Sequence, residues 1–229
     1  MDINPDEIKH HIKDHYSKSV KWRPGFKSSK NDKIISKCIN YLKRKQFEKI
    51  IKNCNNLDNK IILDAGCGNG EYSLALAKKF PNSMIYAIDF SKSMCEFTKE
   101  RAKESNLNNI IVKEGDVDNL EFKDNFFDTV ICIDLLHHIP DKTINKAISE
   151  LSRVIKNQGT LITDFKNKHN PILYYQHKKK NRITYYRTNR TIRFMKNVLK
   201  QSNLSTNKVF GAGGPSFIAP YVTIISKKK

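Results

Sequence analysis

Acidic residues are missing from the last part of this chain. No aspartate or glutamate follows Asp164, whereas residues 165–229 contain 15 lysines and arginines. Residues 1–60 have a net charge of +8 and residues 61–164 a net charge of −4, so the excess of +19 lies entirely in the two flanks. A basic flank favours an anionic substrate, or an anionic surface that carries the substrate. The alternative is compositional, because chains rich in lysine and asparagine are common where a genome is rich in A and T.

Long apolar runs and paired cysteines are also missing. No apolar run reaches the roughly 18 residues that a membrane-spanning helix needs, and residues 1–5 lack the pattern of a signal peptide. The five cysteines are odd in number and show no C-x-x-C spacing, which predicts buried thiols in a reducing compartment and no metal site. We therefore expect a cytoplasmic protein, and the length of 229 residues predicts one domain of ordinary size.

What the chain does contain is a strand, a glycine turn and a helix in direct succession. Residues 61–63 are apolar, Asp64 follows, and glycines stand at positions 66, 68 and 70. The apolar residues within 72–77 then predict an amphipathic helix. Glycine at such a turn admits a positive φ and lets a ligand lie against the backbone. The N-terminus of the helix offers free N–H groups and a partial positive charge to a carboxylate.

The glycine spacing differs from the dinucleotide fingerprint G-x-G-x-x-G, because Glu71 stands where that pattern requires its third glycine. Further apolar runs follow, and most of them lead into an acid. An acid at the tip of the second strand, here Asp89, can accept both hydroxyls of a ribose. The runs that predict strands two to five are 84–88, 110–112, 127–133 and 160–162.

In order and spacing, these motifs resemble those of the class I S-adenosylmethionine-dependent methyltransferases, most of all the small-molecule group that includes quinone-biosynthesis enzymes. The resemblance covers residues 61–164. It implies an α/β, Rossmann-like fold: a seven-stranded, mostly parallel sheet with helices on both faces and strand seven antiparallel beside strand five. It also implies S-adenosylmethionine as the cofactor. The alternative is a Rossmann-like domain that binds another nucleotide or none.

The resemblance implies a cofactor site at the strand ends. Asp89 would bind the ribose, an acid at the place of Asp116 would meet the adenine amino group, and Val117 would pack on the adenine ring. The residues that we expect in this site are Asp64, Ala65, Gly66, Cys67, Gly68, Gly70, Asp89, Phe90, Met94, Gly115, Asp116, Val117, Ile133 and Asp134.

Three histidines are candidates for a general base. His137 and His138 follow the fourth strand, beside the expected position of the methyl group, and His169 follows the fifth. An imidazole suits proton transfer near neutral pH. In the structural alternative, the pair His137 and His138 closes the floor of the site or caps a helix that begins near Asp141.

The flanks are expected to build the substrate entrance. Residues 1–60 predict a helical N-terminal arm, in which a helix at 32–52 packs on the sheet edge and covers the cofactor. Residues 61–229 would form the methyltransferase domain, with an aromatic and basic cap inserted at about 165–186. The remaining elements predicted from periodicity are an amphipathic helix at 187–202 and strands six and seven at 205–210 and 221–225.

The expected function is methyl transfer to a small-molecule acceptor that is anionic or resembles a lipid or quinone. The basic flanks keep an RNA methyltransferase as the alternative, although the sequence contains no recognised RNA-binding module. A subunit that lacks catalysis is disfavoured, because the glycines and acids of the cofactor motifs are intact. A protein acceptor is the remaining hypothesis.

Overall fold

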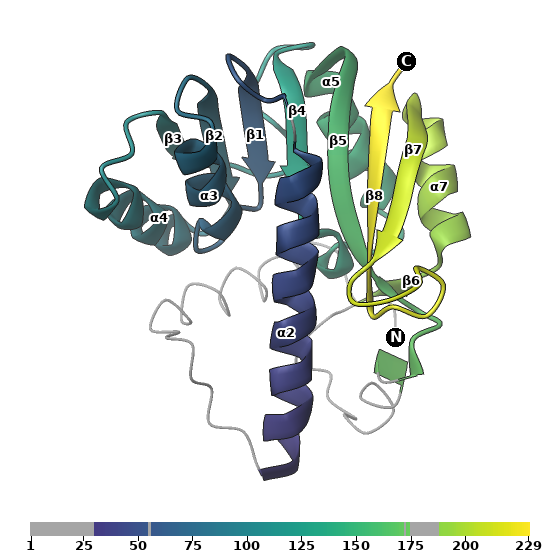
Figure 1. The fold of residues 1–229 in the computed structure, drawn as a ribbon. Helices are drawn as coiled ribbons and strands as arrows, with labels where there is room; N and C mark the ends of the chain where they lie inside the picture. The colour runs from purple at the N-terminus through teal and green to yellow at the C-terminus, as the bar shows by residue number, and fades with distance from the viewer. Residues whose placement is uncertain (1–29, 55, 172, 175–187) are drawn as a thin grey trace.

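The computed structural model describes residues 30–54, 56–171, 173–174 and 188–229, which form one sheet with helices on both faces (Figure 1). The strand order is β3-β2-β1-β4-β5-β8-β7, and the short β6 pairs with β5 outside this path. The predicted α/β class with a mostly parallel sheet is confirmed. The strands are β1 (Ile61–Ala65), β2 (Met84–Asp89), β3 (Ile110–Glu114), β4 (Phe127–Cys132), β5 (Ile155–Asn167), β6 (Asn189–Arg190), β7 (Leu204–Gly211) and β8 (Tyr221–Lys228).

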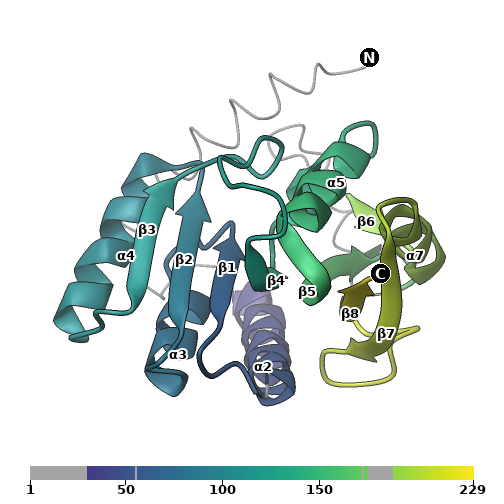
Figure 2. The ribbon, with the colours of Figure 1, turned by 90° about the horizontal axis from the view of Figure 1, so that it is seen from above.

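Two sets of helices cover the sheet. Figure 2 shows α2, α3 and α4 on one face and α5 and α7 on the other. The helices connecting β1, β2 and β3 share a face because these connections run the same way across the sheet, and a crossover between parallel strands is right-handed. The helices are α2 (Lys30–Asn53), α3 (Glu71–Lys79), α4 (Lys92–Glu104), the 3-10 turn η2 (Leu136–His138), α5 (Ile144–Val154) and α7 (Ile192–Gln201).

The apolar core lies in two layers, one on each face of the sheet. Successive side chains of a strand point to opposite faces, so a strand covered on both sides is apolar at consecutive positions. On the face of α5 and α7 the buried strand residues include Leu63, Val130 and Leu161; on the face of α2 and α3 they include Ile62, Ile131 and Ile162. The continuous apolar runs of the sequence follow from this double coverage.

Strand β8 runs antiparallel to both of its neighbours, β5 and β7. Tyr221 lies opposite Lys166 of β5, and Val222 lies opposite Gly211 of β7. The prediction of an antiparallel strand at 221–225 beside strand five is therefore confirmed. The two-residue β6 makes the sheet eight-stranded rather than seven-stranded.

Helix α7 begins at Ile192, later than the predicted start of the helix at 187–202. The buried Arg190 explains the difference, because its backbone pairs with β5 and its guanidinium donates to the carbonyl of Leu136 at 2.6 Å. These contacts hold residue 190 in an extended segment. Thr191 then caps the helix, since its hydroxyl accepts the N–H group of the third residue along at 3.1 Å.

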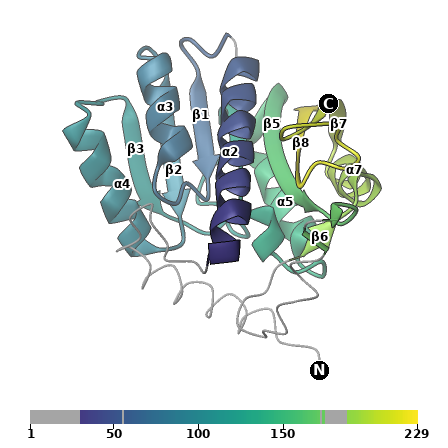
Figure 3. The ribbon, with the colours of Figure 1, turned by 60° about the horizontal axis from the view of Figure 1, so that its bottom comes forward.

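Helix α2 crosses the face of the sheet, which corrects the prediction that it packs on the edge. Figures 1 and 3 show it passing in front of the middle of the sheet, between α3 and β8. Gln46 donates to Asp164 of β5 at 2.8 Å and to Thr223 of β8 at 3.1 Å. Ile50, one turn further, is fully buried against the strands. The first half of α2 extends past the edge where β1 and β4 end, which we call the carboxyl edge (Figure 1).

Two predicted segments lie largely outside the described residues: the N-terminal arm before residue 30 and most of the cap at 165–186. At the start of that cap, β5 continues to Asn167, so residues 165–167 belong to the sheet. None of the helices in the described ranges has the length and apolar character that crossing a membrane requires.

Candidate functional site

The glycine turn between β1 and α3 is packed on one side and open on another. Gly66, Gly68 and Gly70 have φ angles of 79°, 50° and 77°. A Cβ atom on Gly70 would lie 2.6 Å from Cγ2 of Thr98 in α4, so this position has no room for a side chain. A Cβ atom on Gly68 would meet nothing within 4 Å. A ligand could therefore lie against the backbone at Gly68.

Asp89, the last residue of β2, is hydrogen-bonded to this turn. Its Oδ2 atom accepts the N–H of Gly68 at 2.9 Å, and its Oδ1 atom accepts the N–H of Ser91 at 2.9 Å. Burial raises the pKa of the carboxyl group. Each carboxylate oxygen has a second lone pair, so both can accept a further hydroxyl. The structure brings Asp89 and Gly68 into contact, whereas ribose binding by Asp89 stays a prediction.

Asp64 holds the start of α3 in place. The hydroxyl of Ser73 donates to Asp64 Oδ2 at 2.5 Å, and burial raises the pKa of Asp64 to about 6. The residue is 2% exposed, so its carboxyl group is enclosed by the turn and the helix. The neighbouring predicted residues Ala65, Cys67, Met94 and Ile133 are also buried, and Phe90 is half-buried.

The loop after β3 brings the third predicted motif to the same edge of the sheet. The N–H of Gly115 donates to the carbonyl of Asp89 at 3.0 Å. Asp116 Oδ1 accepts the N–H of Asp118 at 3.0 Å, which closes a local turn. Val117 belongs to the buried cluster on the α5 face. Contacts of Asp116 and Val117 with an adenine therefore stay predictions.

A polar cluster lies where β4 and β5 end, beneath α2. The N–H of Asp134 donates to Asp164 Oδ1 at 2.7 Å, and the ammonium group of Lys43 binds Asp134 Oδ2 at 2.6 Å. Burial and the neighbouring Asp134 raise the pKa of Asp164 to about 6. Burial also acts to raise the pKa of Asp134, but Lys43 and Lys166 lower it below its ordinary value. At this edge the environment thus favours the ionised form of Asp134 and the protonated form of Asp164.

Lys43, Gln46 and Asp164 were not among the predicted site residues. Two signals in the sequence could have found the last two. Gln46 stands between Leu42 and Ile50 on the apolar side of the predicted helix, and Asp164 stands between the apolar residues Ile162 and Phe165. Polar side chains are buried only with hydrogen-bonding partners, so each of these positions indicates a contact with another segment.

His137 and His138 form the turn η2 directly after this cluster. They are 2% and 5% exposed, and their ring centroids are 3.9 Å apart. Nε2 of His137 lies 3.7 Å from Asp134 Oδ1. The carbonyl of His137 accepts the N–H of Thr188 at 2.8 Å, so the turn also anchors the segment that leads into β6. This arrangement is compatible with both predicted roles, a base and a floor of the site.

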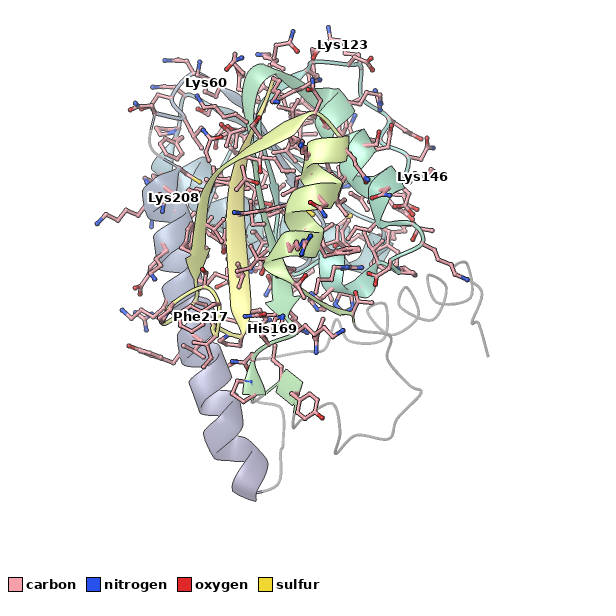
Figure 4. The ribbon with its side chains drawn as sticks, turned by 90° about the vertical axis from the view of Figure 1, so that its right-hand side faces the viewer. Lys60, Lys123, Lys146, His169, Lys208 and Phe217 are labelled. Atoms are coloured by element: carbon pink, nitrogen blue, oxygen red, sulfur yellow. The ribbon has the colours of Figure 1, made fainter. Side chains whose placement is uncertain are left out.

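His169, the third candidate base, lies apart from this pair. It follows the end of β5 and is exposed, and its backbone N–H donates to Asn167 Oδ1 at 3.0 Å. Figure 4 shows His169 at the end of the molecule past which α2 extends, far from Lys60 and Lys123 at the opposite end. His169 is thus on the correct edge of the sheet but outside the buried cluster.

Known proteins resemble this chain over the segment that carries the site. Residues 62–159 match a family model described as a methyltransferase domain. This segment is therefore similar to the methyltransferase domains of that family. The chain is similar to the demethylmenaquinone methyltransferase of Staphylococcus haemolyticus, with 33% identity over 137 residues, 59% of this chain and 55% of the relative. The corresponding protein of a Geobacillus species is 33% identical over 116 residues, 50% of this chain and 49% of the relative. The chain therefore spans about half the length of the curated relatives that it matches.

The fold of the chain superposes on solved structures. Magnesium protoporphyrin IX methyltransferase from Synechocystis PCC 6803, solved with bound S-adenosylmethionine, gives a TM-score of 0.75 at 20% identity over 97% of both chains. The [4+2]-cyclase SpnF gives a TM-score of 0.67 at 16% identity over 80% of both chains. These likenesses confirm the predicted Rossmann-like fold of class I. Because one of these two neighbours is a cyclase, the fold does not by itself determine the reaction.

Proposed function

We propose that this chain transfers a methyl group from S-adenosylmethionine to a small-molecule acceptor. The observation that carries the proposal is the open backbone at Gly68, directly beside the Asp89 carboxylate. The match of residues 62–159 to a methyltransferase domain supports it, as do relatives named for methyl transfer to demethylmenaquinone. The same comparisons give the RNA alternative no support.

The described residues are suited to holding the cofactor. The free lone pairs of Asp89 would accept the two ribose hydroxyls, and the absence of a side chain at Gly68 would let the cofactor lie on the turn. Asp116 and Val117 would complete the adenine side. When bound, S-adenosylmethionine supplies a methyl group that a positively charged sulfur already activates. The protein must then align the acceptor with that methyl group and, for a hydroxyl or an acidic carbon, remove a proton.

For the proton transfer we propose His137. Its Nε2 atom lies 3.7 Å from Asp134 Oδ1, so a carboxylate stands next to the ring when the ring has taken up a proton. Lys43 holds that carboxylate through the contact at 2.6 Å with its other oxygen. His138 and His169 are the competing candidates.

We further propose that the acceptor is anionic or resembles a quinone lipid. The support is the charge of +15 over residues 165–229, without one acid, and the names of the curated relatives. A basic entrance would raise the local concentration of such an acceptor. The cytoplasmic location expected from the unpaired cysteines stays a prediction.

The test combines binding with turnover. Calorimetry should detect S-adenosylmethionine binding that weakens about tenfold to a hundredfold in Asp89→Ala, the cost of a charged hydrogen-bond acceptor. A cofactor analogue without ribose hydroxyls should bind the parent and the variant equally weakly, which separates ribose recognition from a disturbed turn. Methyl-labelled cofactor should then transfer its label to a short-chain demethylmenaquinone. A chain that does not bind the cofactor would refute the proposal, and labelling of bulk tRNA alone would favour the RNA alternative.

A further inference from the structure

An exposed apolar pair lies in the loop between β7 and β8. Phe217 is 70% exposed, the largest value for a large apolar side chain in the described ranges, and Ile218 is 45% exposed. The pair stands between Pro215 and Pro220 in the sequence. Adjacent exposed apolar side chains of this size are a recurrent mark of an interaction surface.

The backbone that carries this pair is fixed from the inside. Nδ2 of the buried Asn167 donates to the carbonyls of Ser216, Phe217 and Ala219 at 3.2, 3.1 and 3.0 Å. Nδ2 of the buried Asn170 donates to the carbonyl of Ile218 at 2.7 Å. The two apolar side chains are therefore presented to solvent by a rigid loop. Such preorganisation lowers the entropy lost when a partner binds.

Another exposed aromatic residue lies near the same end of the molecule. Tyr174, 64% exposed, follows Asn170 by one helical turn, and its N–H donates to the carbonyl of Asn170 at 3.0 Å. Figure 4 shows Phe217 near His169, at the end past which α2 extends. By contrast, the exposed Met84 begins β2 and so lies at the amino edge of the sheet. The apolar surface is concentrated at the end where an acceptor would enter.

We propose that the loop of Phe217 and Ile218 docks this chain on the surface of an anionic lipid bilayer. An apolar tip on a strongly basic segment fits the boundary between headgroups and acyl chains, because the tip enters the apolar layer while cations meet lipid phosphates. Residues 165–229 have a charge of +15 and no acid, but this charge is spread over the segment, and Lys227 and Lys228 end β8 at the amino edge. At the loop itself, the exposed Lys49 donates to the carbonyl of Gly211 at 3.1 Å, and the exposed Lys168 stands next to His169. A second copy of the chain is a poor partner, since two molecules of charge +19 repel each other.

This inference deepens the proposed function, because a bilayer is where a lipid-like acceptor would be met. Its test needs no turnover, so the two can fail separately. The chain is mixed with vesicles of phosphatidylcholine that contain 30% phosphatidylglycerol, in roughly 0.1 M salt, and bound protein is separated by flotation. The parent chain should bind these vesicles and bind pure phosphatidylcholine more weakly. The variant with Phe217→Ser and Ile218→Ser should lose about tenfold or more in partitioning.

Met84→Ser is the matched control, because it removes an exposed apolar side chain at the opposite edge and should leave vesicle binding unchanged. Unfolding curves and S-adenosylmethionine affinity, which should match the parent, exclude misfolding as the cause. As a second measurement, Phe217→Trp should be quenched by spin-labelled acyl chains in a background where Trp22 is replaced by Phe. Equal vesicle binding by parent and double variant would overturn the proposal. The proposal would also be overturned if the parent formed an oligomer that the double variant cannot form. It would likewise be overturned if the double variant lost as much activity toward a water-soluble acceptor as toward a lipid-like one.

Discussion

Gly68 and Gly70 are two residues apart in one turn, yet an added methyl group meets different surroundings at each. Gly70→Ala places a carbon 2.6 Å from Thr98 and should lower the free energy of unfolding by about 2–4 kcal/mol, from overpacking and left-handed strain together. Gly68→Ala meets open space and should cost only about 1–2 kcal/mol from its φ angle. However, Gly68→Ala should weaken cofactor binding at least tenfold if the cofactor lies on this turn. Urea unfolding measures the stability of the two variants, and calorimetry measures their affinity for the cofactor. A Gly68→Ala chain with unchanged cofactor affinity would contradict the prediction.

Asp164, within β5, predicts a defined pH dependence of stability. Asp164 has a pKa of about 6 in the folded chain, above its ordinary value, so the folded state holds this proton more tightly than the unfolded state. Its contribution to stability is present below about pH 4 and is lost as the pH rises through about 6. Asp164→Asn keeps the shape without the charge, and Gln46 can turn its amide to accept from the new side chain. The variant should therefore gain on the parent by about 1–3 kcal/mol between pH 4 and 7.

Asp128 is the control, because its contribution to stability should change with pH in the direction opposite to that of Asp164. Although burial acts to raise its pKa, the N–H of Ile61 and the ammonium of Lys156 lower it below the ordinary value. Its contribution to stability is present above its unfolded pKa and is lost as the pH falls. Urea unfolding of Asp128→Asn from pH 7 to 3 should show the parent losing its advantage toward low pH. If both variants show the same slope, the assignment of the two environments is wrong.

A buried amide links helix α2 to two strands of the sheet. Gln46→Ala would leave Asp164 Oδ2 and Thr223 without their donor, and should lower the free energy of unfolding by about 1–3 kcal/mol. Lys45→Ala, next in sequence, removes a surface ion pair with Glu48 and an exposed contact with the ring of Tyr41, and should change stability by about 1 kcal/mol or less. Hydrogen exchange over α2 should accelerate in the first variant alone. Equal exchange in both would mean that the apolar residues of α2 hold it without Gln46.

Which elements the sequence could predict depends on the range of the contacts that form them. Strands β1, β2 and β4 and helix α3 follow from local periodicity and from the glycine turn, and the structure has them within a residue or two of the predicted positions. The short β6 and the late start of α7 follow from Arg190, whose partner Leu136 is 54 residues away. Strand β5 begins at Ile155, earlier than the predicted run 160–162, and its register with β4 shifts in this stretch, where Gln158 has a φ of 62°.

The same distinction applies to the candidate site. Asp89, Gly115 and Asp134 could be found because each lies at or just after the end of a strand, and parallel strands bring their carboxyl ends to one edge. Lys43 and Gln46 reach this edge over 91 and 118 residues, from a helix whose place on the sheet no local pattern specifies. Sequence periodicity therefore assigns residues to faces, but it does not say which helix lies over which strand end.

For the whole molecule, the separation of charge between core and flanks predicts a salt-dependent rate. Replacing Lys178, Lys179, Lys180 and Arg182 together by neutral residues should raise KM for an anionic acceptor, with a smaller effect on kcat, because steering acts before chemistry. The difference from the parent should shrink as salt increases, since added ions screen exposed charges beyond about 8–10 Å at 0.1–0.15 M. The measurement is kcat/KM across a salt series. Identical values for parent and variant at every salt concentration would leave composition as the explanation of the charge.

The position of β8 between β5 and β7 has a consequence for the order in which the sheet can close. Strand β7 precedes β8 in the chain, but in the described part of the chain its ladder partner is β8 alone. Until β8 has joined the sheet, β7 and one edge of β5 are therefore unpaired. During that interval two strand edges are open to pairing with other chains, which is the usual route to aggregation. A chain truncated after residue 211 should therefore aggregate more readily than the full chain at the same concentration.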